Sequence, residues 1–221
     1  MKRSPAAAAY RRARQPAGRT PWRSAAFCVV DLETTGLDPR RDAIVAWSAV
    51  PVDGGRVVLA GAREGLARPA AGVPATSVLI HGLRELDLAE APPLTEAADA
   101  LLEALAGRIL VAHAAWVERA FLRRALRPRG ARLHRRIVDT AALGRLWLSE
   151  RDGSTPRTLA LGDLARELAL PVHRPHTAAG DALTTAQAFI ALATHLDTLK
   201  GETVRSLAAG QRRLDASRLY K

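Results

Sequence analysis

The sequence predicts one α/β domain in which helices flank a mixed five-stranded sheet. Three expected strands come first along the chain, and helices and strands then alternate, an order typical of α/β folds. The 221 residues suffice for one domain of ordinary size, and 48% apolar with 25% charged residues is a normal globular balance. No apolar run approaches the roughly 20 residues of a membrane-spanning helix, so we expect no membrane association.

Each expected strand is a short apolar run bounded by turn residues. The first run ends on Asp31, as expected for a buried strand that reaches the edge of a sheet. The second and third are separated by Asp53-Gly54-Gly55, which favours a hairpin turn. We therefore expect strands at residues 26–30, 44–52, 56–60, 109–112 and 137–138.

Helices are expected where apolar residues recur at helical spacing. Thr95 can cap a helix whose apolar stripe runs from Ala98 to Leu105, and Gly107 would end it. Residues 61–93 lack such a pattern and are expected to form loops. The later helices are expected at residues 116–126, 140–150, 158–169 and 179–196.

The net charge of +11 is located at the two ends of the chain. Residues 1–24 contain seven basic and no acidic residues, residues 200–221 contain six basic and two acidic ones, and residues 25–199 are neutral. We therefore expect a flexible basic arm (1–24), a globular domain (25–199) and a basic C-terminal tail (200–221). Arginine-rich segments of this kind suit a nucleic-acid partner, although they can equally serve only solubility.

The single cysteine and the N-terminus predict a cytoplasmic protein. Cys28 has no partner for an intramolecular disulfide and cannot build a cysteine zinc site. The apolar stretch after Lys2-Arg3 is shorter than the roughly 7–15 residues of a secretion signal.

Four acidic residues from three separate segments point to a metal site. Asp31 and Glu33 are two residues apart on the first strand, so both side chains point to the same face. Glu118 and Asp181 lie early in expected helices, and His176 precedes Asp181 by five residues. Each residue alone is more simply explained as a solvated or helix-capping group.

Together, these residues suit phosphodiester hydrolysis. Four carboxylates favour hard cations such as Mg²⁺ or Mn²⁺ over Zn²⁺. Two such ions roughly 4 Å apart stabilise the attacking and leaving oxygens of an in-line phosphoryl displacement. A histidine with an ordinary pKa of about 6.5 is able to accept the proton of the attacking water.

Three motifs in order carry a resemblance to a known family. They are Val-Asp-Leu-Glu-Thr-Thr-Gly-Leu at 30–37, Leu-Val-Ala-His-Ala-Ala-Trp-Val-Glu at 110–118, and His-Thr-Ala-Ala-Gly-Asp-Ala at 176–182. Ile-His-Gly-Leu at 80–83 and Val-Asp-Thr at 138–140 match further landmarks. Over residues 26–196 the chain resembles the DEDDh 3′–5′ exonucleases, the DnaQ-like group that includes bacterial proofreading epsilon subunits.

The resemblance implies a ribonuclease H-like fold and two-ion removal of 5′-mononucleotides from the 3′ end of single-stranded DNA or RNA. It implies that Asp31 bridges two Mg²⁺ or Mn²⁺ ions, that Glu33 and Asp181 complete the first site, and that Glu118 supports the second. His176 would be the general base. The remaining implied substrate contacts are Thr34 and Thr35 near the terminal sugar, His81 near the terminal nucleotide, and His113 in the second motif.

The second motif departs from the family pattern at two positions. Glu118 stands where the family has Asp, and Ala114 stands where it has Asn. A glutamate side chain is longer by about 1.5 Å, whereas a catalytic arrangement tolerates roughly 0.5 Å. The alternative function is therefore a catalytically impaired module that binds nucleic acid or accompanies a DNA polymerase.

A second basic cluster begins on the expected Glu118 helix. It contains no acidic residue and consists of Arg119, Arg123, Arg124, Arg127, Arg129, Arg132, Arg135 and Arg136. This cluster would either bind phosphates beside the site or form a solvated surface, and the sequence favours neither interpretation over the other.

Overall fold

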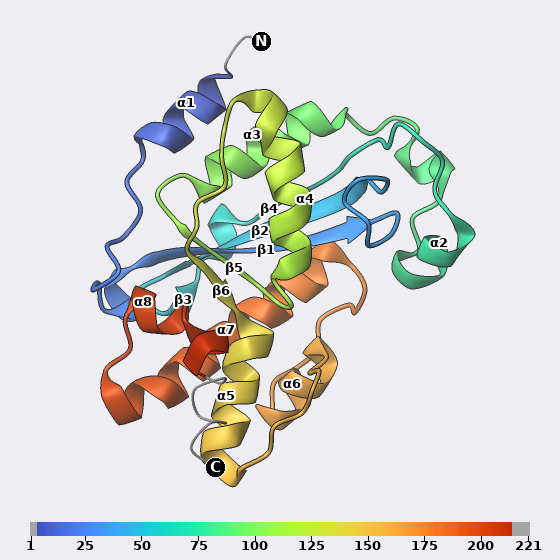
Figure 1. Cartoon of the computed structure of the whole chain (residues 1–221). Coiled ribbons are helices and arrows are strands. Elements are labelled where there is room, and N and C mark those ends of the chain that lie inside the picture. Colours follow the sequence, from blue (N-terminus) through green and yellow to red (C-terminus); the bar gives the residue numbers. More distant parts are fainter. Residues whose placement is uncertain (1–3, 214–221) are drawn as a thin grey trace.

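A six-stranded mixed sheet forms the centre of the structure, with helices on both of its faces (Figure 1). The structure is a computed structural model that describes residues 4–213, apart from the side chains of residues 199 and 200. The strands are β1 (Ala26–Thr34), β2 (Ile44–Asp53), β3 (Arg56–Val57), β4 (Arg63–Leu66), β5 (Ile109–Ala112) and β6 (Ile137–Asp139). The expected α/β fold with a mixed sheet is confirmed, with six strands instead of five.

The strand order explains how the sheet is mixed. Along the sheet the order is β3-β2-β1-β5-β6, and β4 also pairs with β2. The β1–β2 and β2–β4 pairs are antiparallel, whereas β1–β5 and β5–β6 are parallel. The carboxyl ends of β1, β5 and β6 therefore lie at the same edge of the sheet, where ligands bind in open α/β sheets.

The described part of the chain contains eight α-helices, seven of which cover the sheet. They are α1 (Pro5–Arg12), α2 (Ala75–His81), α3 (Leu94–Leu105), α4 (Trp116–Leu126), α5 (Thr140–Asp152), α6 (Leu161–Glu167), α7 (Ala178–Lys200) and α8 (Val204–Leu207). One face of the sheet packs against α1, α3 and α4, and the other against α5, α6, α7 and α8. Alternation along β1 supplies both cores, since Val30 belongs to the first and Val29 to the second.

The expectation of a flexible arm is wrong for residues 4–24. Ser4 caps α1 by accepting a hydrogen bond from the amide of Ala7, and Pro5 occupies the first turn. Tyr10 is buried against the first core, and its hydroxyl accepts a hydrogen bond from the His134 amide at 3.1 Å. The segment packs because Ala7 and Tyr10, three residues apart, form a small apolar stripe among the arginines.

The C-terminal tail also packs as far as it is described. Val204 and Leu207 of α8 are buried in the second core. The amide of Trp22 donates to the carbonyl of Glu202 at 3.1 Å, and the buried Trp22 ring lies edge-on to Phe189. The two basic ends of the chain are thus held together; residues 1–3 and 214–221 lie outside the described residues.

The stretch expected as loops contains a strand and a helix. Arg63–Leu66 forms β4 opposite residues Ala46–Ala49, and Ala75–His81 forms α2. Both escape sequence patterns because β4 is a short edge strand and α2 is largely exposed. Conversely, the expected strand 56–60 is shorter, because β3 ends at Val57 and a turn of 3₁₀ helix follows at Leu59–Gly61.

Candidate metal centre

Strand β1 carries two of the predicted acids near its carboxyl end. Asp31 pairs in register with Ser48, and Glu33 with Ala46. The strand continues to Thr34, so both acids lie within it instead of following its end. Leu32, between them, points into the first core. Asp31 and Glu33 therefore face the same side, as their spacing predicts.

Helix α7 brings Asp181 to the same place. Asp181 is in the first turn of α7, and its Oδ2 accepts a hydrogen bond from the backbone amide of His176 at 3.1 Å. Gly180 is required here, because a Cβ atom would collide with the carbonyl oxygens of His173 and Arg174. Carboxylate oxygens of Asp31, Glu33 and Asp181 all lie within 4.8 Å of one another.

Glu118 is the fourth acid and approaches from the first turn of α4. Its side chain is only 4% exposed, and Oε2 has no hydrogen-bond partner among the described residues. Burial, followed by the charges of Asp139 and Glu33, raises the pKa of Glu118 from 4.5 to about 8. Glu118 lies outside the tight group of three acids, yet after burial its charge is the largest cause of the raised pKa of Asp31.

The pKa values show that this cluster is electrostatically unfavourable without a cation. Burial is the largest effect on Asp31, whose pKa lies well above its usual value, with Glu118, Asp181 and Glu33 adding to it. Burial and Asp181 raise the pKa of Glu33 to about 7. Burial also raises the pKa of Asp181, and the nearby His176 opposes this shift. A divalent cation would compensate these charges, and four oxygen donors are the ligands it prefers.

A pocket beside Glu33 contains the predicted His81. The pocket has a volume of about 270 Å³, and its walls include Glu33, His81, Trp47, Arg174 and Thr177. His81 is buried, which lowers its pKa, and its Nδ1 accepts a hydrogen bond from the Leu83 amide. Sequence reasoning missed Trp47 and Arg174; only the position of Arg174, two residues before His176, could have indicated it.

The predicted threonines hold the turn after β1. Thr34 Oγ1 donates to the carbonyl of Gly36 at 2.7 Å. Thr35 Oγ1 accepts from the Ala43 amide and donates to Asp42. Both hydroxyls are thus engaged within the protein, and a contact to the terminal sugar stays a prediction.

His113 and His176 differ in their accessibility. The ring nitrogens of His113 contact Thr140 Oγ1 at 3.0 Å and the Leu159 carbonyl at 2.8 Å. Substrate binding by His113 stays a prediction. It would require the substrate to replace Thr140 or Leu159 as the partner of one ring nitrogen. His176 is exposed, with a left-handed backbone (φ 60°), and lies close enough to influence Glu33 and Asp181.

The second motif is strained at the position of its unusual alanine. Ala114 has a φ of 53°, in the left-handed region that Asn tolerates better than Ala. Asp139, at the carboxyl end of β6, caps α5 and raises the pKa of Glu118. In the sequence, Asp139 stands out only as part of the Val-Asp-Thr landmark at 138–140, which gives no indication of its effect on Glu118.

Comparisons with known proteins identify the family of the chain. The model of the RNase T family, described as exonuclease, matches residues 28–189. A DNA polymerase III subunit epsilon-like protein of Rhodobacter capsulatus is 33% identical over 193 residues, which cover 86% of this chain and 26% of that protein. The 3′-5′ exonuclease DinG of Bacillus subtilis is 27% identical over 82% of this chain and 19% of its own length.

A solved structure supports the fold. Exonuclease X in complex with 5′ overhanging duplex DNA superposes with a TM-score of 0.64 at 22% identity, covering 84% of this chain and 99% of that one. The chain spans only about a quarter or less of the length of the two relatives. Among the described residues, no helix combines the length and apolar character needed to cross a membrane.

Proposed function

This chain belongs to the RNase T exonuclease family, and we propose that it hydrolyses phosphodiester bonds at the 3′ end of DNA or RNA, releasing 5′-mononucleotides. The observation that carries the proposal is the convergence of Asp31, Glu33 and Asp181 within 4.8 Å, with buried Glu118 beside them. The polarity is supported by the name of the 3′-5′ exonuclease relative.

The acids fit a pair of Mg²⁺ or Mn²⁺ ions. Asp31, Glu33 and Asp181 would hold one ion, and Asp31 with Glu118 would hold the other. The unpartnered Oε2 of Glu118 supports this, because a buried carboxylate oxygen without a partner is costly. When bound, such ions activate water and stabilise the charge that develops during phosphoryl transfer.

The remaining residues would position the substrate and move a proton. The water oxygen forms a bond to phosphorus as the bond from phosphorus to the 3′ oxygen breaks. His176 would accept the proton of that water, since it is exposed beside Glu33 and Asp181. The pocket around His81 and Trp47 would receive the terminal nucleotide, whose sugar would lie near Thr34 and Thr35.

Degradation of labelled strands tests the proposal directly. Single-stranded DNA and RNA with a 5′ label should each be offered with Mg²⁺, with Mn²⁺ and with a chelator. We expect a metal-dependent ladder shortening from the 3′ end, abolished by Asp31→Ala. This variant should fold normally, because it removes one of several mutually repelling acids. Equal degradation by wild type and Asp31→Ala would refute the proposal.

A second candidate function follows from the altered second motif. With Glu118 and Ala114 in place of Asp and Asn, the chain would be a binding module without catalysis, and the epsilon-like name of one relative supports a DNA polymerase as its partner. Titration with Mn²⁺ separates the candidates, because a working site should bind it with an affinity that depends on Glu118. A cytoplasmic location is part of either proposal.

A further inference from the structure

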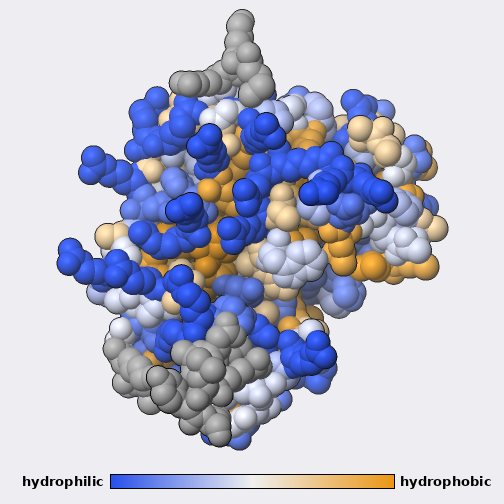
Figure 2. Space-filling view, in the orientation of Figure 1, coloured by the Kyte–Doolittle hydropathy of each residue, from blue (hydrophilic) through white to orange (hydrophobic). Residues whose placement is uncertain are grey.

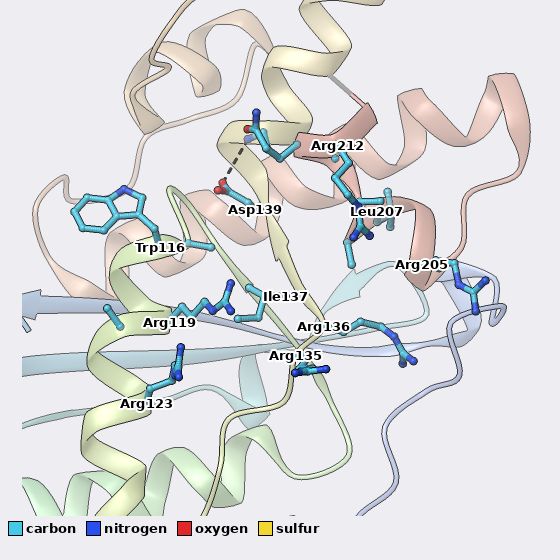
Figure 3. A pocket seen from close by; sticks show the side chains of 17 residues that line it. Trp116, Arg119, Arg123, Arg135, Arg136, Ile137, Asp139, Arg205, Leu207 and Arg212 are labelled. Carbon is cyan, nitrogen blue, oxygen red and sulfur yellow. Dashed lines mark hydrogen bonds between the residues drawn. The ribbon is translucent and has the colours of Figure 1, made fainter. Parts of the chain in front are cut away.

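A groove lined by arginines lies along α4, the helix that carries Glu118. It has a volume of about 720 Å³ and lies between α4, β6 and the segment after α8. In Figure 3, Arg119 and Arg123 of α4 lie on one side, Leu207 and Arg212 on the other, and Ile137 of β6 between them. We call this the arginine groove; its arginines are Arg119, Arg123, Arg135, Arg136, Arg205 and Arg212.

The groove extends further along α4. A second hollow of about 870 Å³ shares Arg119, Arg123 and Arg135 with the first and adds Arg127 and Arg132. The fold thus joins basic residues of the C-terminal tail to the cluster on α4, which the sequence separates. Figure 2 shows hydrophilic side chains crowded on the face that carries α4, with a strip of hydrophobic surface between them.

Within residues 4–213, the charges of the groove arginines are largely left without an acidic partner. Among the described residues, Arg119, Arg123 and Arg135 form no ion pair, and Asp139 is the only acid in the lining. Arginines elsewhere are paired, for example Arg108 with Asp53. Several unpaired arginines along one concave surface favour an extended anion, because each phosphate contact releases counterions.

The groove and the acidic cluster are neighbours through the first turn of α4, which contributes Trp116 to the one and Glu118 to the other. Trp116 lines the groove and is 58% exposed, whereas Glu118 of the same turn is buried and its charge raises the pKa of Asp31. Asp139 links the two regions, since it lines the groove and raises the pKa of Glu118. An exposed tryptophan at this junction can stack on an unpaired base.

We propose that the arginine groove binds the phosphate backbone of a single nucleic-acid strand whose 3′ end lies at the acidic cluster. This inference rests on the proposed function for the position of the 3′ end. Arg119 and Arg123 contact successive phosphates, and Trp116 stacks on a base at the junction. An acidic protein segment fits less well, because the exposed Trp116 in the lining offers a stacking surface that a nucleic-acid base can use and a carboxylate cannot.

Charge reversal tests the groove without catalysis. Binding of a 5′-fluorescein oligothymidylate of about 16 nucleotides is measured by anisotropy in EDTA over a salt series. Arg123→Glu should weaken binding roughly 10-fold and lower the salt slope by about 0.7, the value for one phosphate contact to a single strand. Arg119→Glu repeats the test one turn nearer the start of α4, and thermal unfolding confirms that each variant is folded.

Arg56→Glu is the matched control. Arg56 is exposed on β3, at the opposite edge of the sheet, and forms no ion pair with a described residue, so this substitution changes the net charge equally. Equal affinities of Arg56→Glu, Arg119→Glu and Arg123→Glu would overturn the inference even if the protein degrades DNA. Groove-dependent binding by a protein that cleaves no 3′ end would instead sustain the binding of nucleic acid in the groove, and it would remove the proposed function together with the position of the 3′ end.

Two further measurements identify the ligand class. Trp116→Ala should weaken oligothymidylate binding roughly 5- to 100-fold without changing the salt slope, because stacking involves no charge. A glutamate peptide of the same charge should bind more weakly than the oligonucleotide. If it binds equally well and depends equally on Arg123, the groove serves an acidic protein segment and the nucleic-acid assignment is wrong.

Discussion

At the scale of single residues, Glu118 decides whether the site works with an altered ligand. Glu118→Gln keeps the shape and removes only the negative charge. If a bound cation depends on that charge, the rate of 3′ hydrolysis should fall at least about 100-fold, as when one preorganised electrostatic group is lost. Single-turnover degradation with Mn²⁺ measures this rate.

The same substitution has a built-in control for folding. With a pKa of about 8, Glu118 is mostly protonated at neutral pH without metal, so Gln imitates its metal-free state. The melting temperature in EDTA should therefore stay close to wild type. Full activity of Glu118→Gln would remove Glu118 from the metal site, and a gain in activity by Glu118→Asp would indicate an impaired site.

Ala114 offers a test of strain in the second motif. Its left-handed backbone costs an alanine about 1 kcal/mol, whereas Asn adopts this conformation more readily. We expect Ala114→Asn to raise the free energy of unfolding by about 0.5–1 kcal/mol, measured by denaturant titration. Ala115→Asn, at the neighbouring position with right-handed backbone and a buried side chain, should instead destabilise the protein.

The site was predictable where local pattern determines it. Alternation places Asp31 and Glu33 on one face, and the structure agrees because β1 is regular there. The contacts of Thr35 and His113 could not be predicted, because their partners, Asp42 and Leu159, depend on how loops return to the sheet. The pocket residue Trp47 comes from β2, whose apolar sequence suggests only core.

At the scale of elements, α1 is the clearest difference between expectation and structure. Tyr10→Ala should lower the free energy of unfolding by about 3 kcal/mol, because the side chain is fully buried against the first core. For a domain of this size that corresponds to a decrease in melting temperature of roughly 6–12 °C. Calorimetry measures it directly.

Arg12→Ala is the control on the same helix. Arg12 is exposed, so its replacement should change the free energy of unfolding by less than about 0.5 kcal/mol. A flexible arm, in contrast, would make both substitutions silent. Deletion of residues 1–24 does not isolate the role of their charges, because it also removes the buried Tyr10 and Trp22.

Elements with strong periodicity were predictable, and those held by distant contacts were not. Helix α4 begins and ends as expected, and β5 has the expected bounds, since one repeats at helical spacing and the other is a continuous apolar run. Strand β4 exists because Arg63–Leu66 pairs with β2, and its Gly65 leaves room for the Trp47 ring. Such pairing has no signal in a four-residue segment with one apolar residue.

At the scale of the whole molecule, the net charge of +11 is concentrated by the fold. The two basic ends meet where Pro21 bridges Thr203, and Arg205 and Arg212 then lie with the arginines of α4. Composition alone suggests two independent tails. In the structure, parts of both ends instead belong to the folded domain. A substitution there can therefore change both the salt dependence of binding and the stability of the fold, so both should be measured on the same variants.

The stability of the metal-free protein should fall as pH rises. Burial and mutual repulsion raise the native pKa of Glu33 to about 7 and of Glu118 to about 8, above the ordinary 4.5 of the unfolded chain. Between these values the native state binds more protons than the unfolded state, so stability decreases with pH. From about pH 6.5 to 8.5 the expected loss is roughly 3 kcal/mol, about two-thirds of it from Glu118, or roughly 6–12 °C in melting temperature.

Metal should reverse this trend, because cations bind the deprotonated acids. Melting temperatures in EDTA and with Mn²⁺ should therefore diverge as pH increases, and binding of Mn²⁺ should release protons. The range above pH 6.5 is chosen because burial lowers the pKa of His81, His113 and His134, which affects stability in the opposite direction at lower pH. Glu118→Gln should remove most of the decrease in EDTA. If the melting temperature in EDTA stays constant or rises over this range, the four acids do not form the buried, mutually repelling cluster on which the metal site depends.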